Sequence, residues 1–377
     1  MDLPRTTEDV LGLITDATTQ GRRLEITGGG THRHVGAPRP DARLLGTSAL
    51  TGIVDYDPAE LVMTVRAGTP LAELEAALAE QGQGFMFEPS GAAGATIGGV
   101  IGASVSGSRR VSAGAVRDFV LGFEAVSGRG ERFKAGGKVV KNVTGFDLSK
   151  LVCGSWGRLA VLTEVTLKVL PAPAECRTLS WTGLDTAAAW DLMGEAMCAP
   201  ADVAAAAWRP DPGVAQLRLE GFGPSVDART LTLTALLSRF GAPVETTGEA
   251  AMAAWHSVQQ GEDLSDAPIL WRLSVPRSAG LVVARRLDAL NCRWIADWAG
   301  GLIWAATDAE AGEIRALAAS AGGHATLVRA PETVRSRVPA FHPQPKAMAA
   351  LSERVRRAFD PQGLFETGRF LDTHDAD

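Results

Sequence analysis

The chain has 377 residues, of which 46% are hydrophobic, 21% charged and 6% aromatic. This length exceeds one ordinary domain, and the composition excludes a disordered, collagen-like or coiled-coil chain. The formal net charge is −6, and neither half of the chain is basic enough to indicate nucleic acid as the main partner. The sequence therefore predicts a globular protein of two domains.

The compartment is predicted from what the sequence lacks. The four cysteines lie more than twenty residues apart and form no C-x-x-C pair, which is typical of thiols in a reducing compartment. The N-terminus has neither the basic flank nor the apolar run of a secretory signal, and no stretch has the ~18 uncharged apolar residues of a membrane span. We expect a cytoplasmic protein, with peripheral association to the inner face of the membrane through partners left open.

The first 173 residues are predicted to mix helices and strands. Thr6 begins a helix whose apolar residues recur at helical spacing, and a strand follows at 24–27. A hairpin is expected over 52–56 and 61–66, then a helix at 70–81. A strand pair, 119–126 with 131–135, and a strand at 159–170 follow. Prolines at 171 and 173 mark the end of this domain.

After residue 173 the pattern becomes two successive β-α-β-β-α-β units, which is the ferredoxin-like order. The first runs from 176 to 246 and the second from 269 to 328, with a helix at about 250–260 between them. We therefore predict an α+β fold with three parts: a first domain at 1–173, a second α+β domain at 174–330, and a C-terminal segment at 331–377 that packs back on the first domain.

Three glycine-rich segments lie in the first domain, at 28–32, 89–107 and 138–147. Glycine lets backbone N–H groups approach an anionic ligand closely, although turns and tight packing explain any single cluster equally well. No segment has the G-x-G-x-x-G spacing of a Rossmann site or the spelling of a P-loop. Together with five interspersed basic residues, the three clusters favour a large dianionic ligand such as a dinucleotide. The five are Arg109, Arg110, Arg117, Lys138 and Lys141.

Several of these motifs resemble a known family. Thr96-Ile97-Gly98-Gly99 and Ala115-Val116-Arg117-Asp118 are similar to the FAD-binding domain of the vanillyl-alcohol oxidase / p-cresol methylhydroxylase (PCMH-type) superfamily. The run from Lys141 to Leu151, the Gly322-Gly323-His324 turn and the ending Phe359-Asp360-Pro361 resemble the glycolate oxidase FAD-binding subunits. The resemblance implies that residues 1–173 are a PCMH-type FAD-binding domain of two lobes with FAD extended between them. It also implies that residues 174–330 are an α+β cap domain.

The resemblance also implies which residues bind FAD. Loop 28–32 and residues 96–99 match segments that surround the diphosphate, 114–118 and 142–145 match segments along the flavin and ribityl chain, and 159–163 match the strand at the adenine end. The candidate cofactor-binding residues are Gly28, Gly29, Gly30, Thr31, His32, Pro89, Thr96, Ile97, Gly98, Gly99, Gly102, Ser104, Gly107, Gly114, Val116, Arg117, Asp118, Lys141, Asn142, Val143, Thr144, Gly145, Gly157, Leu159 and Val161. At Gly98 in particular, a Cβ is expected to block the approach of the backbone to phosphate.

Binding of FAD is expected to be non-covalent. Some relatives attach FAD through a histidine directly after the glycines, but Thr31 holds that position here, and His32 and His34 are then ordinary loop histidines. No metal site is expected either, because the H-x-G-D-G-N-x-H element of the FAD-linked 2-hydroxy-acid dehydrogenases is absent. The catalytic residues stay unknown. His324, His342 and Arg329 are weak candidates, each equally explained by a structural role.

The resemblance implies an FAD-binding subunit of a glycolate oxidase complex, taking part in electron transfer from the oxidation of glycolate, a 2-hydroxy acid, to glyoxylate. Its implied partners are a larger FAD-containing subunit and an iron–sulfur subunit. Two alternatives stay open: a self-sufficient FAD-dependent oxidoreductase of a small 2-hydroxy acid or alcohol, and a cofactor-free scaffold subunit.

Overall fold

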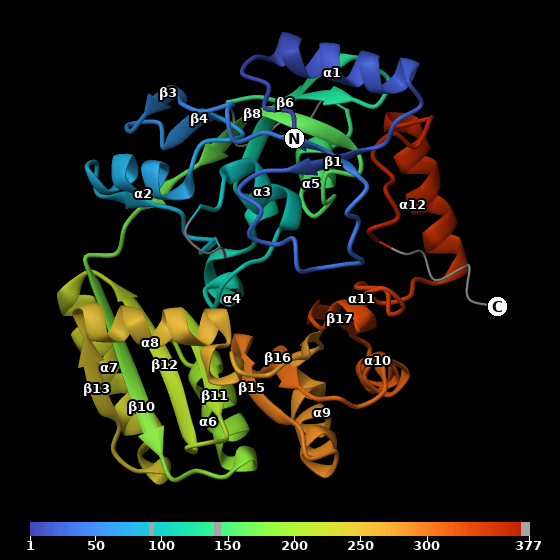
Figure 1. Cartoon of the computed structure of the whole chain (residues 1–377). Coiled ribbons are helices and arrows are strands. Elements are labelled where there is room, and N and C mark those ends of the chain that lie inside the picture. Colours follow the sequence, from blue (N-terminus) through green and yellow to red (C-terminus); the bar gives the residue numbers. More distant parts are fainter. Residues whose placement is uncertain (90–93, 139–144, 371–377) are drawn as a thin grey trace. The chain divides into compact units, whose positions relative to one another are not determined.

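The computed structural model describes residues 1–89, 94–138 and 145–370, and it divides into two compact units (Figure 1). Unit 1 comprises Met1–Ser106, Ala115–Pro171 and the chain from Pro343 onward. Unit 2 comprises Gly107–Gly114 and Ala172–His342. These limits differ from the predicted domain ends at 173 and 330. The chief difference is the short segment Gly107–Gly114, whose contacts are with strands of unit 2, as its hydrogen bonds to Glu220 and Asp297 illustrate.

Unit 1 begins with helix α1 (Thr7–Thr19) and the parallel strands β1 (Leu24–Thr27) and β2 (Arg43–Gly46). The predicted helix start is confirmed. The Thr6 side chain accepts from the N–H of Asp9 while the Asp9 carboxylate accepts from the N–H of Thr6, which is a capping box. The apolar face of α1 packs with both strands in one buried cluster, so this lobe has its own core.

A five-stranded antiparallel sheet forms the rest of unit 1, with strand order β3-β4-β8-β6-β7. The predicted hairpin and strand pair are confirmed. The strands are β3 (Ile53–Asp57), β4 (Val62–Arg66), β6 (Val120–Ser127), β7 (Arg132–Gly136) and β8 (Ala160–Lys168). Around them lie α2 (Leu71–Ala79), α3 (Ile97–Ala103), η1 (Val116–Asp118), α5 (Leu148–Val152) and the short pair β5 (Gln83–Gly84) and β9 (Leu170–Pro171).

The C-terminal part of unit 1 is helix α12 (Lys346–Phe359) and an irregular segment that follows it. Asp360, 1% exposed, accepts from the N–H groups of Leu364 and Phe365 at 2.8 Å each and so closes the turn after the helix. Leu364 and Phe365 then enter the buried cluster of α1 and β1. Residues 360–365 are thereby fixed to the first lobe of unit 1.

Unit 2 contains one eight-stranded antiparallel sheet built from the two predicted β-α-β-β-α-β units, with strand order β13-β10-β12-β11-β15-β16-β14-β17. The first repeat is β10 (Glu175–Thr182), α6 (Thr186–Cys198), β11 (Ala205–Arg209), β12 (Val214–Gly221), α7 (Gly223–Leu236) and β13 (Val244–Thr247). The second is β14 (Leu270–Ser274), α9 (Arg277–Ala289), β15 (Arg293–Asp297), β16 (Leu302–Ala306), α10 (Ala311–Ser320) and β17 (His324–Arg329). β11 pairs with β15, so the two repeats share a single sheet. The two predicted β-α-β-β-α-β units are confirmed.

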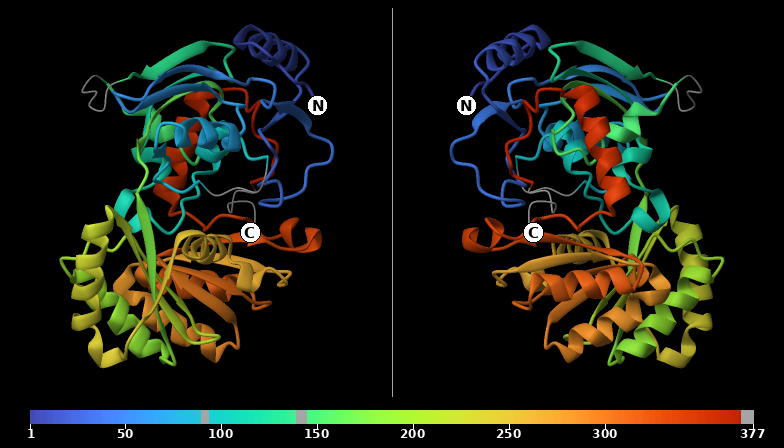
Figure 2. Two further views of the ribbon diagram at one scale, coloured as in Figure 1. Left: turned by 90° about the vertical axis from the view of Figure 1, so that its left-hand side faces the viewer. Right: turned by 90° about the vertical axis from the view of Figure 1, so that its right-hand side faces the viewer.

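Helices cover the two faces of this sheet unequally (Figure 2). Helices α6, α7, α9 and α10 pack on one face over the main core, which includes the buried Trp181, Trp208 and Trp271. Helix α8 (Gly248–Gln260) lies on the opposite face, where Trp255 packs on alternate residues of β11. The remaining short elements of unit 2 are α4 (Arg110–Ala113), η2 (Ser238–Phe240), η3 (Glu262–Leu264), η4 (Trp298–Gly300) and α11 (Glu332–Arg335).

Two further features bear on the sequence analysis. All four cysteines are free thiols. Within the described ranges, no helix is both long enough and apolar enough to cross a bilayer.

Candidate functional site

A pocket of about 760 Å³, counted to its open mouth, lies in unit 1. Its walls come from the loop after β1, the start of α3, the turn before β8, one face of β8 and the C-terminal segment. Predicted cofactor-binding residues that line it are Gly28, Gly29, Gly30, Thr31, His32, Thr96, Gly98, Gly99, Gly102 and Gly157. The structure thus brings the first glycine-rich segment, part of the second and Gly157 to one cavity.

Backbone N–H groups are the main polar groups of this cavity. Within the described residues, the N–H groups of Gly29, Gly30, Thr31 and Gly99 donate no hydrogen bond to the protein. The Thr96 hydroxyl is buried and has no partner there either. Buried donors are normally paired, so this concentration of unpaired donors indicates a ligand with several acceptor oxygens.

Glycine is required here because the two walls touch through their backbones. A Cβ at Gly28 would lie 2.1 Å from the Thr96 hydroxyl oxygen, and one at Gly29 would lie 1.7 Å from the Gly94 carbonyl oxygen. Neither distance is possible, so no other residue fits at these positions in this backbone. At these two positions the close approach leaves only the backbone to face the cavity.

Gly98 is required for a different reason from the one predicted. Its N–H donates to the Ala67 carbonyl at 2.7 Å, and a Cβ would lie 2.8 Å from that same oxygen. Its N–H is therefore already used, and the absent Cβ allows α3 to pack on the backbone after β4. Gly98 shapes the cavity wall, whereas Gly99 beside it keeps an unpaired N–H.

His32 lies at the edge of the cavity as a neutral imidazole. Burial, followed by the nearby charges of His34 and Arg369, lowers its pKa to about 4. Its ring lies 5.9 Å from the His34 ring and 5.9 Å from the Trp156 ring, measured between centroids. His32 therefore carries no charge to the site at neutral pH and contributes its backbone and its ring.

Arg369, from the C-terminal segment, lines the same cavity and was missed by the sequence analysis. It donates to the His32 carbonyl at 2.7 Å, to the Val35 carbonyl at 2.9 Å and to the Glu25 carboxylate at 3.2 Å. On the opposite wall Trp156, also missed, adopts a left-handed backbone with φ 54° and donates its N–H to the Gly102 carbonyl at 3.0 Å. Trp156 lies in the Gly154-Ser155-Trp156-Gly157 stretch, whereas no local motif marks Arg369, because it acts on segments that are distant in the sequence.

The face of β8 that lines the cavity is the one opposite to the prediction. Leu159 and Val161 were predicted to lie at the cofactor, but Ala160 and Leu162 line the cavity. Successive side chains of a strand point to opposite faces, and Val161 is fully buried in the core of the first lobe. The remaining lining residues that the sequence analysis missed are Ile26, Thr27, Arg33, Thr47, Ala67, Ala103 and Ser155.

Other candidate cofactor residues lie away from the cavity. Asp118 caps η1 by accepting from the N–H of Ala115 at 2.9 Å, and Gly107 and Gly114 belong to unit 2. Lys141, Asn142, Val143 and Thr144 lie outside the described residues. The candidates that are described but do not line the cavity are Pro89, Ile97, Ser104, Gly107, Gly114, Val116, Arg117, Asp118, Gly145, Leu159 and Val161.

The three weak catalytic candidates lie in unit 2, on and near β17. Arg329 donates to the Leu264 carbonyl at 2.6 Å, and His342 accepts from the N–H of Ala325 at 3.2 Å. Burial lowers the pKa of both His324 and His342. For Arg329 and His342 these contacts supply a structural role. Among the described residues, no group of three or more His, Cys, Asp or Glu side chains is arranged to hold a metal ion.

Comparison with known proteins identifies the class. Residues 2–136 match the family described as FAD binding domain, and these residues supply both glycine walls of the cavity. The structure is also similar to alkyldihydroxyacetonephosphate synthase, with a TM-score of 0.68 and 14% sequence identity over 96% of this chain and 75% of that one. The chain is therefore an FAD-binding oxidoreductase of the PCMH-type fold, as the sequence predicted.

Curated relatives narrow the class to a family. The chain is 33% identical over 368 residues to glycolate oxidase subunit GlcE of Escherichia coli (strain K12), which covers 96% of each chain. It is 31% identical over 177 residues to glycolate oxidase subunit GlcD of Bacillus subtilis (strain 168) and 33% over 178 residues to a D-lactate dehydrogenase of Archaeoglobus fulgidus. It spans only 38% and 40% of the lengths of these last two relatives. The chain belongs to the family of glycolate oxidase subunit GlcE.

Proposed function

We propose that this chain is the FAD-binding subunit of a glycolate oxidase complex and takes part in electron transfer from glycolate oxidation to glyoxylate. Two observations support the proposal: near full-length similarity to a GlcE subunit, and a cavity lined by unpaired N–H groups. The cavity lined by unpaired N–H groups is the observation that carries the proposal. A diphosphate bridge has several anionic oxygens, and such a ligand matches the donors that the protein leaves unpaired.

The residues that would surround the diphosphate, called the cradle from here on, are of two kinds. Some donate hydrogen bonds to the ligand, and others let the backbone segments pack closely. The N–H groups of Gly29, Gly30, Thr31 and Gly99, with the Thr96 hydroxyl, would hold the diphosphate oxygens of FAD. Gly28 lets the two walls approach each other, and Gly98 lets α3 pack on the backbone of Ala67. When bound, FAD supplies the isoalloxazine ring that accepts and passes on reducing equivalents. The chain's own part is to hold the dinucleotide and exclude water from the charged bridge.

Attachment of FAD is proposed to be non-covalent. Thr31 follows the glycines directly, at the position where some related flavoproteins carry the linking histidine. The next residue, His32, has its Nδ1 atom 3.1 Å from the Thr31 hydroxyl, and its carbonyl is held by Arg369. Release of all flavin from the chain on acid precipitation is the expected result.

The partners and the location of the complex are proposals as well. Separate curated subunits named GlcE and GlcD support a complex of several chains, in which the larger FAD-containing subunit carries the hydroxy-acid site. An iron–sulfur subunit would pass the electrons onward. We propose a cytoplasmic location for the complex, peripheral to the inner face of the membrane through its partners.

A self-sufficient oxidoreductase is the second candidate, because 47% of the chain is also similar to a D-lactate dehydrogenase. The two candidates are separated by purifying the chain alone and recording its flavin spectrum under anaerobic conditions with glycolate or D-lactate. We expect a yellow chain that neither acid reduces alone and that glycolate reduces once the larger subunit is added. Reduction by either acid without the larger subunit would favour the self-sufficient enzyme, and a colourless chain that takes up no FAD would exclude both.

A further inference from the structure

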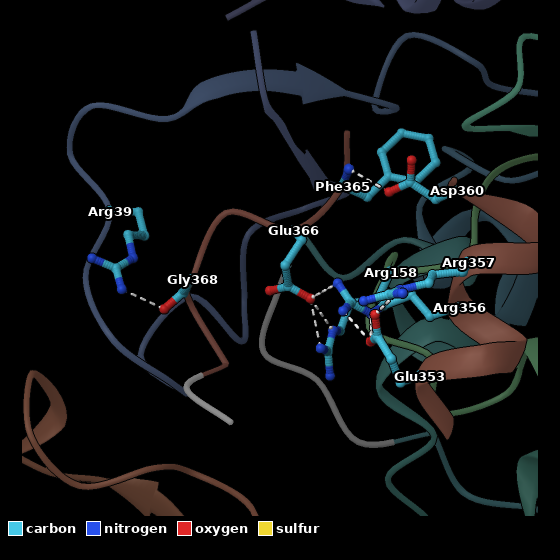
Figure 3. A network of polar contacts seen from close by, with 9 residues as sticks. All are labelled: Arg39, Arg158, Glu353, Arg356, Arg357, Asp360, Phe365, Glu366 and Gly368. Carbon is cyan, nitrogen blue, oxygen red and sulfur yellow. Dashed lines mark hydrogen bonds and ion pairs between the residues drawn. The ribbon is translucent and has the colours of Figure 1, made fainter. Parts of the chain in front are cut away.

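The C-terminal strap, defined here as residues 364–370, connects two walls of the FAD cavity. It begins on β1, where the N–H of Leu24 donates to the Leu364 carbonyl at 2.8 Å. Its first two residues are buried in the core of the first lobe. From this anchored start the strap reaches the loop after β1 through Arg369. It reaches the turn before β8 through Glu366 (Figure 3).

The first wall is the loop at 28–37, and Arg369 holds it. All three guanidinium nitrogens are used: Nε donates to the Val35 carbonyl, Nη1 to Glu25 and Nη2 to the His32 carbonyl. The loop also donates a hydrogen bond to the strap, from the N–H of Ala37 to the Arg369 carbonyl at 2.7 Å. Arg369 lines the cavity, but its donors face the loop, so its effect on a ligand passes through the loop.

This arrangement fixes one of the peptide planes that carry the cradle donors. A carbonyl held on one side of a peptide unit turns the N–H of that unit to the other side, because the unit is planar. Arg369 holds the His32 carbonyl, and the N–H of the same peptide unit, which belongs to Arg33, donates to the Gly30 carbonyl at 3.2 Å. The Gly30 carbonyl lies in the peptide unit that carries the unpaired N–H of Thr31. The Arg369 fork therefore limits rotation at the end of the cradle, where glycine backbone alone would leave it free.

The second wall is the turn at 155–158, and Glu366 holds it. One carboxylate oxygen, Oε2, accepts from Arg158 Nη2 at 2.6 Å and Nε at 3.1 Å, and from Arg356 Nη1 at 2.6 Å (Figure 3). Arg158 directly follows Gly157, which lines the cavity. Phe370, at the end of the strap, adds a ring contact to Trp156 at 5.4 Å between centroids.

We infer that the C-terminal strap is a positioning element that sets the affinity for FAD, with Arg369 and Glu366 as positioning residues that hold the two walls of the cradle in their binding geometry. The inference rests on the proposed function, because it concerns the same cavity. Pre-organised donors bind more tightly because a ligand does not bear the entropic cost of ordering them. Loss of the three hydrogen bonds that the Arg369 guanidinium donates should therefore weaken binding of FAD more than it lowers the stability of the fold.

The test compares FAD dissociation constants of the flavin-stripped full-length chain, measured by quenching of FAD fluorescence, with its melting temperature. Arg369→Met is expected to weaken FAD binding at least tenfold and Glu366→Gln at least threefold. The matched control is Arg357→Gln, which removes an exposed arginine paired with Glu353 on α12 and should leave binding within twofold. Binding within twofold of wild type in Arg369→Met would overturn the inference.

Two further variants separate positioning from charge balance. Arg369→Lys keeps a cation facing the buried Glu25 but lacks the planar guanidinium that reaches three separate acceptors, so it should restore the melting temperature without restoring affinity. Glu25→Gln combined with Arg369→Met removes the buried carboxylate that has lost Arg369 and keeps only the more distant Arg33 at 3.6 Å, so the measurement stays possible if the single variant unfolds. Full affinity in either variant would overturn the inference. A wild-type chain that binds no FAD would overturn the proposed function and the strap inference together.

Discussion

Ser108 donates a hydrogen bond from its hydroxyl to the Asp297 carboxylate at 2.7 Å, although the two residues lie 189 positions apart. Both side chains are 1% exposed, and the other carboxylate oxygen of Asp297 accepts from the N–H of Trp298 at 2.7 Å. The indole of Trp298 donates in turn to the Gly107 carbonyl at 2.9 Å. The chain leaves unit 1 after Ser106 and returns to it at Ala115. These contacts hold the intervening segment 107–114 within unit 2.

Removing the Ser108 hydroxyl should therefore destabilise unit 2. In Ser108→Ala a buried carboxylate loses a donor, and a buried charged acceptor left short of a partner costs about 1–3 kcal/mol. Chemical denaturation followed by tryptophan fluorescence measures the loss, since unit 2 holds most of the tryptophans. Ser112→Ala is the control, because Ser112 is exposed and donates to the main-chain carbonyls of Arg109 and Ala204 and not to a carboxylate. An equal loss in both variants would contradict the role of the buried carboxylate.

Gly102→Ala should separate stability from cofactor binding. Gly102 lies in α3 and lines the cavity, and a Cβ there would meet no protein atom within 4 Å. Replacing a helical glycine with alanine stabilises by about 0.5–1 kcal/mol, so the flavin-free chain should become more stable. The added methyl group is expected to occupy space that FAD needs and to weaken its binding severalfold.

The control for this substitution is Gly12→Ala in α1. Gly12 is exposed, also has free space for a Cβ and lies outside the cavity lining. Thermal denaturation of the flavin-free chain and FAD titration give the two quantities for each variant. Both variants should gain stability, and only Gly102→Ala should lose affinity. Unchanged affinity in Gly102→Ala would show that its side of the cavity does not contact the cofactor.

The elements predicted correctly are those whose own residues determine them. Helix α1 has its cap and its apolar spacing within fourteen residues, and the repeats of unit 2 combine strong alternation with helical periodicity. Strand β2 was missed because it offers only two adjacent leucines, and its strand form depends on pairing with β1. Helix α3 was missed because three of its seven residues are glycine. Its packing on Ala67 overrides that weak helical preference.

The sequence indicated the glycines that line the cavity, but not the residues, such as Arg369, that hold its walls in place. Glycine clusters are visible in a sequence because a backbone cradle requires them at adjacent positions. Arg369 gives no such signal, since its acceptors are main-chain carbonyls 334 and 337 residues away and any residue has a carbonyl. The face of β8 was mistaken by one residue because both alternating sets along that strand are apolar at Ala160, Val161 and Leu162.

The stability of the flavin-free chain should depend on pH through His32. Its pKa is about 4 in the folded chain against about 6.5 when exposed. Between these values the unfolded chain binds more protons, so stability is complete above about pH 6.5 and falls as the pH drops towards 4. The difference between the two pKa values corresponds to about 3 kcal/mol at most.

Urea denaturation between pH 4 and 7 measures this contribution. In His32→Asn the fall in unfolding free energy over this range should be smaller than in wild type, because the buried titrating group is gone. His256→Asn removes an exposed histidine of α8 and is the control. If His32→Asn and wild type lose stability in parallel, His32 is not buried as a neutral group.

Arg272 on β14 has an environment that makes its replacement informative. Its guanidinium carbon lies 4.7 Å from the Trp298 ring centroid and 5.8 Å from that of Trp304. In the part of the chain that the structure describes, Arg272 makes no hydrogen bond or ion pair. Burial and then the nearby charge of Arg110 lower its pKa to about 10. The nearby Asp297 carboxylate acts in the opposite direction, so the contacts with two indole rings and this charge are what stabilise the cation within the chain.

Arg272→Met should consequently cost little stability. Methionine keeps the length and the contact with both indoles, and it removes a charge whose burial is unfavourable without a counter-ion. We expect the free energy of unfolding to stay within about 1 kcal/mol of wild type or to rise, because cation–π contacts offset only about 0.5–2 kcal/mol. Arg293→Met on β15 removes an exposed ion pair with Asp266 and gives the scale of an ordinary surface loss. A loss above about 2 kcal/mol in Arg272→Met would mean that an anion, either the nearby Asp297 carboxylate or one outside the described chain, stabilises Arg272 in the folded protein.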